Sequence, residues 1–101
     1  MSEKKDLRRH SRISQATPVE LSWTDRHGAP HSEKARCVDV SESGMRIEAS
    51  ISIDKGTYVT VRANSLSLHG SASVRSSARK GSKYVLGLHF TGGMKWSGKT
   101  P

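Results

Sequence analysis

Apolar and polar residues alternate along most of the chain, as they do in strands that bury one face. In the segment 18–23 the apolar positions are Val19, Leu21 and Trp23, and each is followed by a polar residue. The same period of two predicts five further strands, at about 32–40, 45–49, 58–61, 66–76 and 84–90. No segment longer than about ten residues has helical periodicity. We therefore predict an all-β fold, a six-stranded antiparallel β-barrel.

Polar segments that contain glycine are expected to join several of these strands. Residues 25–30 have the composition of a turn, and residues 79–82 form a second turn that leads into the sixth strand. The sequence Asp54-Lys55-Gly56 is expected to close a hairpin between the third and fourth strands.

The alternation also assigns the two faces of the second strand, at about 32–40. One face is expected to carry Ala35, Cys37 and Asp39, and the other Arg36, Val38 and Val40. Cys37 is the single cysteine of the chain, so it has no partner for an internal disulfide. We interpret it as a small apolar residue of a strand.

Both ends of the chain lack this pattern. We expect residues 1–13 to be a flexible basic arm, residues 14–91 to form the barrel, and residues 92–101 to be a flexible tail whose helix is short or absent. No stretch approaches the roughly 18 to 20 apolar residues of a membrane span, and the first ten residues are charged where a signal peptide is apolar. The prediction is a cytoplasmic protein of one domain without a membrane span.

Charge is distributed unevenly along the 101 residues, whose formal net charge is +8. Residues 1–54 carry nine basic and nine acidic side chains, whereas residues 55–101 carry eight basic and no acidic ones. A cationic surface of this kind favours an anionic partner, which could be a nucleotide, a nucleic acid or an anionic lipid.

Two short motifs lie before and inside the predicted barrel. The first is Arg8-x-x-x-Arg12, with Arg9 inside it, and the second is Asp39-x-Ser41-x-x-Gly44. Alone, the first reads as a solvated basic tail. The second alone reads as a turn that Asp39 or Ser41 caps, with Gly44 at positive φ. Their occurrence together, in this order, makes both of these interpretations weaker.

In these two motifs the chain resembles the PilZ domain, a bacterial receptor family for cyclic di-GMP. The family signature is an RxxxR arm before the first strand and a [D/N]xSxxG turn after the second, and 26 residues separate Arg12 from Asp39 here. The sixth strand, YVLGLHF, is also similar to the closing strand of the family, so the resemblance covers about residues 6–91. Family members commonly finish with a helix, but this chain has only eleven residues after Phe90, three of them glycine.

The chemistry of cyclic di-GMP fits the residue types of both motifs. An arginine fork can bind two phosphate oxygens, or the N7 and O6 edge of guanine, in bidentate fashion. Since an ionised aspartate only accepts hydrogen bonds, Asp39 suits the N1–H and amino edge of guanine. Ser41 can add a hydroxyl contact, and Gly44 allows close backbone approach. In an extended arm Arg8 and Arg12 point to one side and Arg9 to the other, so Arg9 is the second choice.

The resulting hypothesis is a receptor or adaptor, not an enzyme. Cyclic di-GMP is its ligand, no cofactor is expected, and ligand binding orders the arginine arm and presents a new surface to a downstream protein partner. No metal site is expected, because His27-x-x-x-His31 spans a turn that contains Pro30.

Two alternatives stay open. The first is a basic barrel that binds RNA or single-stranded DNA, for which Lys80 and Lys83 are candidate contacts. It is disfavoured because Trp23, Tyr84 and Phe90 are expected on inward faces, which leaves too few aromatic residues for base stacking. The second is an adaptor that binds protein partners without a ligand.

Overall fold

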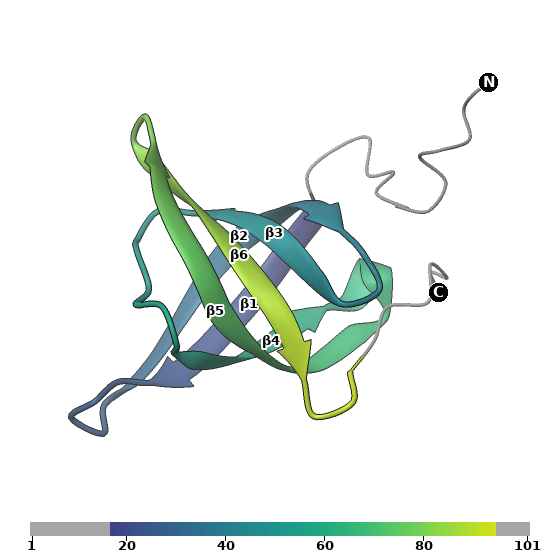
Figure 1. Ribbon diagram of the computed structural model, residues 1–101, viewed down its shortest axis with the longest axis horizontal. Coiled ribbons are helices and arrows are strands. Elements are labelled where there is room, and N and C mark those ends of the chain that lie inside the picture. Colours follow the sequence, from purple (N-terminus) through teal and green to yellow (C-terminus); the bar gives the residue numbers. More distant parts are fainter. Residues whose placement is uncertain (1–16, 95–101) are drawn as a thin grey trace.

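A closed six-stranded antiparallel barrel forms the part of the chain that the computed structural model describes, residues 17–94 (Figure 1). Its strands are β1 (Thr17–Thr24), β2 (Pro30–Val40), β3 (Gly44–Ala49), β4 (Tyr58–Ala63), β5 (Leu68–Lys80) and β6 (Lys83–Thr91). Around the barrel their order is β1-β2-β3-β6-β5-β4, and β4 pairs with β1 to close it. The predicted fold class is therefore confirmed.

The barrel is filled by apolar side chains of the strands, and of the three aromatic residues predicted to face inward Phe90 is buried while Trp23 and Tyr84 are partly buried. Leu21, Ile47, Val61, Val74 and Leu86 are among its largest fully buried side chains. Every strand contributes apolar side chains to this single core. Because the sheet closes on itself, it buries its apolar face without a second layer of helices or strands.

One predicted connection is wrong, because β3 and β4 do not form a hairpin. β3 pairs with β2 and β6, whereas β4 pairs with β1 and β5. Residues 50–57 therefore link two strands that are not neighbours, and Gly56 takes a positive φ of 92° in a turn closed by the Thr57 N–H and the Asp54 carbonyl. This segment is held to β5 by the Gly56 N–H bond to the Val74 carbonyl.

The predicted faces of β2 are also partly wrong. A β-bulge lies between Cys37 and Asp39, where the register with β3 shifts. Because a bulge adds one residue, Cys37 and Val40 are both buried although they were predicted on opposite faces, while Asp39, predicted on the face of Cys37, is only partly buried.

β5 begins two residues later and ends four residues later than predicted. Before it, Asn64–Leu66 form a 3-10 turn that ends at Ser67 with a φ of 57°. Its last five residues, 76–80, are exposed and show no apolar alternation, but they pair with β6 as far as Lys80 opposite Lys83.

Beyond β6 the described chain ends in a turn at Gly92 and Gly93 and in Met94, which packs against the core and over Gly70. Residues 17–94 contain no α-helix, and none of their helical segments has the length and apolar character needed to cross a membrane. The predicted arm lies outside the described residues, so the boundary at residue 13 stays a prediction.

Candidate functional site

The corner between β2 and β3 carries the second motif, and the backbone holds it firmly. The Ser41 N–H donates to the Gly44 carbonyl over 2.8 Å and closes a tight turn. The Phe90 N–H donates to the Ser43 carbonyl, also over 2.8 Å, and ties the turn to β6. The corner is therefore a rigid support for the side chains that it presents.

Asp39 reaches the surface at this corner because of the bulge that precedes it. Its side chain is 35% exposed, and its Oδ2 lies 3.8 Å from Nη1 of Arg46, on the neighbouring strand β3. At that distance the ion pair is loose, and no backbone N–H of the described chain binds the Asp39 carboxylate. The carboxylate is thus left able to accept hydrogen bonds from a ligand.

Ser41 lies just past the end of β2, beside Asp39. Its Oγ donates a long hydrogen bond, 3.4 Å, to the Gly44 carbonyl, so the capping role considered for Ser41 is present in weak form. The oxygen of this hydroxyl keeps its acceptor capacity for a further contact.

Gly44 is needed for a reason other than its backbone angles. It is not among the described residues with positive φ, so the interpretation of a left-handed turn at this position is wrong. A Cβ atom at Gly44 would instead overlap the carbonyl oxygen of Leu88 on β6. Glycine therefore lets β3 approach β6 at the corner.

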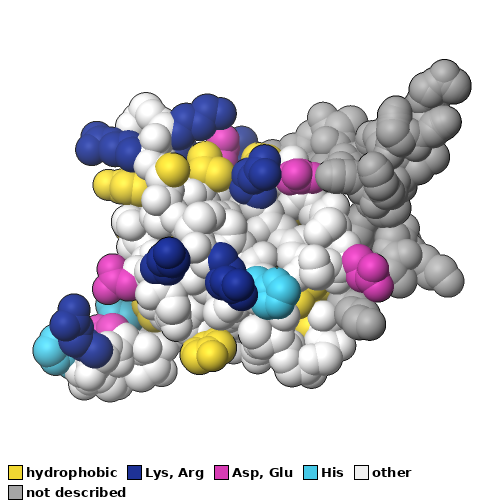
Figure 2. Space-filling model, in the orientation of Figure 1, with side chains coloured by type: hydrophobic (Ala, Val, Ile, Leu, Met, Phe, Trp, Pro, Cys, Tyr) yellow, Lys and Arg dark blue, Asp and Glu magenta, His cyan; other side chains and the backbone are white. Residues whose placement is uncertain are grey.

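A shallow groove of about 440 Å³ extends from this corner across the outer face of β3 and β6 to β5. It brings together Asp39, Ser41 and Gly44, the three motif residues that the structure describes. Its polar rim also includes Arg46, Arg75 and His89. Figure 2 shows Lys or Arg side chains beside a histidine over β5 and β6. The groove therefore combines an acceptor at one end with donors along its length.

The motif search missed the three basic residues on the rim of this groove. Arg46 stands opposite Asp39 in the β2–β3 ladder and opposite Gly87 in the β3–β6 ladder. Arg75 and His89 come from β5 and β6, so only the strand order brings them to the corner.

The N-terminal arginines Arg8, Arg9 and Arg12 lie outside the described residues. Their point of attachment, however, is described. Thr17, the first residue of β1, pairs with Cys37 on β2, two residues before Asp39. Four residues separate Arg12 from Thr17, and the five Cα–Cα steps between them can span up to about 17 Å. Arg12 is therefore tethered within reach of the corner.

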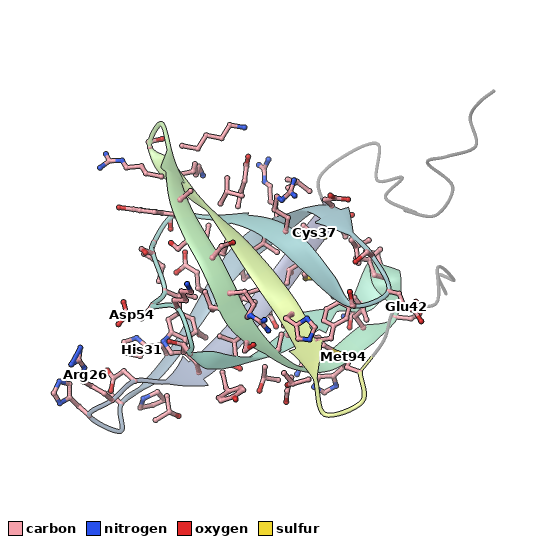
Figure 3. The ribbon with its side chains drawn as sticks, in the orientation of Figure 1. Arg26, His31, Cys37, Glu42, Asp54 and Met94 are labelled. Carbon is pink, nitrogen blue, oxygen red and sulfur yellow. The ribbon has the colours of Figure 1, made fainter. Side chains whose placement is uncertain are left out.

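A second and larger groove, of about 800 Å³, lies among the β1–β2 hairpin, the segment 51–57 and β4. Figure 3 labels Arg26, His31 and Asp54 at that end of the molecule and Glu42 of the corner at the other. Asp25 and Asp54 both line this second groove. The Asp25 carboxylate is already engaged, because Oδ1 accepts from the N–H groups of His27 and Ala29, and Oδ2 lies 2.8 Å from Nε2 of His31. This groove is thus a weaker candidate for an anion- and base-binding site.

The groups around Asp25 lower the pKa of its carboxyl. The side-chain hydrogen bond to His31 is the largest cause, followed by the backbone N–H of Ala29. The His31 ring also stacks on Trp23, with ring centroids 5.3 Å apart. Across residues 17–94, no three His, Cys, Asp or Glu side chains gather closely enough to hold a metal ion.

A closed antiparallel barrel with a carboxylate, a serine and arginines around one open groove defines a small β-barrel binding domain. The family model of the PilZ domain matches residues 6–94, and the chain belongs to this family. PilZ domains are binding and adaptor domains, and the family is in general a receptor for cyclic di-GMP. A comparison with curated proteins found no match.

Proposed function

We propose that this protein is a receptor for cyclic di-GMP, which it binds between the N-terminal arginines and the corner formed by Asp39, Ser41 and Gly44. The observation that carries the proposal is the pairing of Thr17 with Cys37, which attaches the arm beside the corner. Arg8 and Arg12 are the first choice for the arm contacts, and Arg9 is the second.

The groove supports a ligand that carries both a base and a phosphate. The half-exposed Asp39 carboxylate can accept from the N1–H and amino groups of a guanine, while guanidinium groups bind phosphate oxygens or the opposite edge of the base. Arg46 already lies beside Asp39. A guanine would therefore either displace the Arg46 guanidinium from the Asp39 carboxylate or bind the carboxylate together with it. A bare phosphate would gain nothing from Asp39.

Ligand binding would order the arm. Fixing a residue costs on the order of 1 to 2 kcal/mol, and a charge-assisted hydrogen bond returns about 1.5 to 3 kcal/mol. Several such bonds to the two phosphodiesters can therefore offset the ordering of the few residues between Arg8 and Arg12. The ordered arm then forms part of a surface that a downstream protein in the cytoplasm recognises.

Calorimetric titration with cyclic di-GMP tests the proposal. The wild-type protein should bind saturably, and Asp39→Ala, Arg8→Ala and Arg12→Ala should each weaken binding by about tenfold or more, because each removes a charge-assisted contact. Glu42→Ala is the matched control. Glu42 is an exposed carboxylate of the same turn, but it stands at one of the variable positions of the motif. Absence of binding by the wild type, or equal binding by Asp39→Ala and Glu42→Ala, would refute the proposal.

A further inference from the structure

Arg75 occupies a bulge on the far wall of the groove. The register between β5 and β6 shifts between Val74 and Ser76, so Arg75 is the extra residue of this bulge. Val74 is fully buried, whereas Arg75 and Ser76 are both exposed. A bulge commonly re-aims a side chain next to a binding site, and this one turns Arg75 to the groove that Asp39 lines from the other wall.

The charge of Arg75 has no compensating carboxylate among residues 17–94. The other groove arginine, Arg46, pairs with Asp39, and Arg62 lies 4.0 Å from Glu20. Arg79, further along the same hairpin, donates to the Gly81 carbonyl and lies over the Tyr84 ring. Arg75 has none of these contacts, so its guanidinium keeps its full set of donors for an anion.

The spacing of the strands determines how far apart Asp39 and Arg75 lie, and hence the size of a ligand that could contact both. From Asp39 the ladders lead to Arg46, then to Gly87 and then to Ser76, beside Arg75. Three strand spacings of about 4.8 Å make roughly 14 Å. This separation of the two backbones leaves room for a dinucleotide, which can place a base at one wall and a phosphate at the other.

We propose that Arg75 is a phosphodiester-binding residue of the barrel itself. It holds one phosphate of cyclic di-GMP on β5 while Asp39 holds a guanine at the corner, so the barrel contacts both a phosphate and a base of the ligand. This inference rests on the proposed function, and it adds a contact that neither motif contains. Gly87 lies between the two walls, and the Ser76 hydroxyl lies where a Cβ atom at Gly87 would stand, so the floor of the groove carries only small side chains there.

Titration of the full chain with cyclic di-GMP at several salt concentrations tests the role of Arg75. Arg75→Ala should weaken binding by about ten- to one-hundredfold. Arg75→Lys should restore only part of the affinity, because an ammonium group lacks the bidentate fork. Arg79→Ala is the matched control: it removes the same charge from the same hairpin outside the groove, and should change the affinity by less than about threefold.

The outcomes separate this inference from the proposed function. If the wild type binds, Asp39→Ala loses binding and Arg75→Ala binds as Arg79→Ala does, the role of Arg75 is refuted and its charge serves only to keep the exposed end of β5 from pairing. If the wild type does not bind cyclic di-GMP, the proposed function fails and this inference falls with it. Unfolding by urea shows whether any variant has lost its fold.

Discussion

Gly44 approaches the carbonyl group of Leu88 so closely that a Cβ atom would overlap the oxygen. Because the obstacle is backbone, it cannot move aside as a side chain does, and the β3–β6 ladder must shift instead. We expect Gly44→Ala to lower the free energy of unfolding by about 2 kcal/mol, measured by urea denaturation. Ser43→Ala, in the same turn, adds no atoms and serves as the control; equal stability of the two variants would contradict this explanation of the motif glycine.

The buried thiol of Cys37 makes the stability of the barrel depend on pH above 9. Its side chain is 0% exposed, and burial raises the pKa of its thiol from an ordinary 9.0 to about 11. Above pH 9 the unfolded chain releases this proton while the folded protein retains it, so the free energy of unfolding falls as the pH rises from 9 to 11. The part due to Cys37 is about 2 to 3 kcal/mol.

Denaturation of the wild type and of Cys37→Ala between pH 8 and pH 11 isolates this part. The other ionisable side chains are the same in both proteins, so only the slope due to the thiol differs between them. The wild type should lose stability more steeply than the variant. Parallel curves would show that the thiol ionises as easily in the core as in the unfolded chain.

The Asp25 carboxylate stabilises the turn of the β1–β2 hairpin. Asp25 binds the N–H groups of His27 and Ala29 and the ring of His31, and these contacts lower its pKa below the ordinary 3.8. The stabilisation that they give is therefore present above pH 3.8, and it is lost as the pH falls through the lowered pKa.

Asp25→Ala should lower the midpoint of thermal unfolding at pH 7 by a few degrees, followed by circular dichroism. Towards pH 2 the difference from the wild type should shrink, because the carboxyl loses its charge as the pH falls through the lowered pKa. Asp25→Asn keeps an acceptor for the backbone N–H groups and should fall between the two. A difference that stays constant from pH 7 to pH 2 would contradict the role of the charge.

The positions of the strands could be predicted from the sequence, but their pairing could not. Alternation predicted each strand because the burial of one strand face is recorded in that strand's own residues. In β6, for example, the alternating residues Leu86, Leu88 and Phe90 are buried. It did not predict the partner of β3, because Asp54-Lys55-Gly56 forms a turn of the same composition whether it joins neighbouring or distant strands. Pairing depends on contacts made across the whole barrel.

The site was only partly predictable for the same reason. Asp39, Ser41 and Gly44 lie together because six consecutive residues make one turn, and local sequence is enough to find them. Arg75 and His89 join them through the order β3-β6-β5, which no local pattern encodes. The bulges before Asp39 and at Arg75 also follow from register, and a residue-by-residue alternation cannot place an extra residue.

Across the whole molecule, the described aromatic residues argue against a nucleic-acid platform. Phe90 is buried, Trp23 and Tyr84 pack partly against the core, and Trp23 also stacks on His31. Within residues 17–94 this leaves Tyr58, 70% exposed, as the one fully accessible aromatic ring, far too few for successive bases to stack.

If the N-terminal arginines and the Asp39 corner bind the same molecule of cyclic di-GMP, both must respond to the same binding event. NMR titration of the full chain, with backbone amide signals assigned, measures this. We predict that the signals of residues 8–12 and 39–44 shift together along one binding curve, while those of the groove around Tyr58 stay in place. Shifts confined to one of the two segments, or separate curves for each, would contradict the claim.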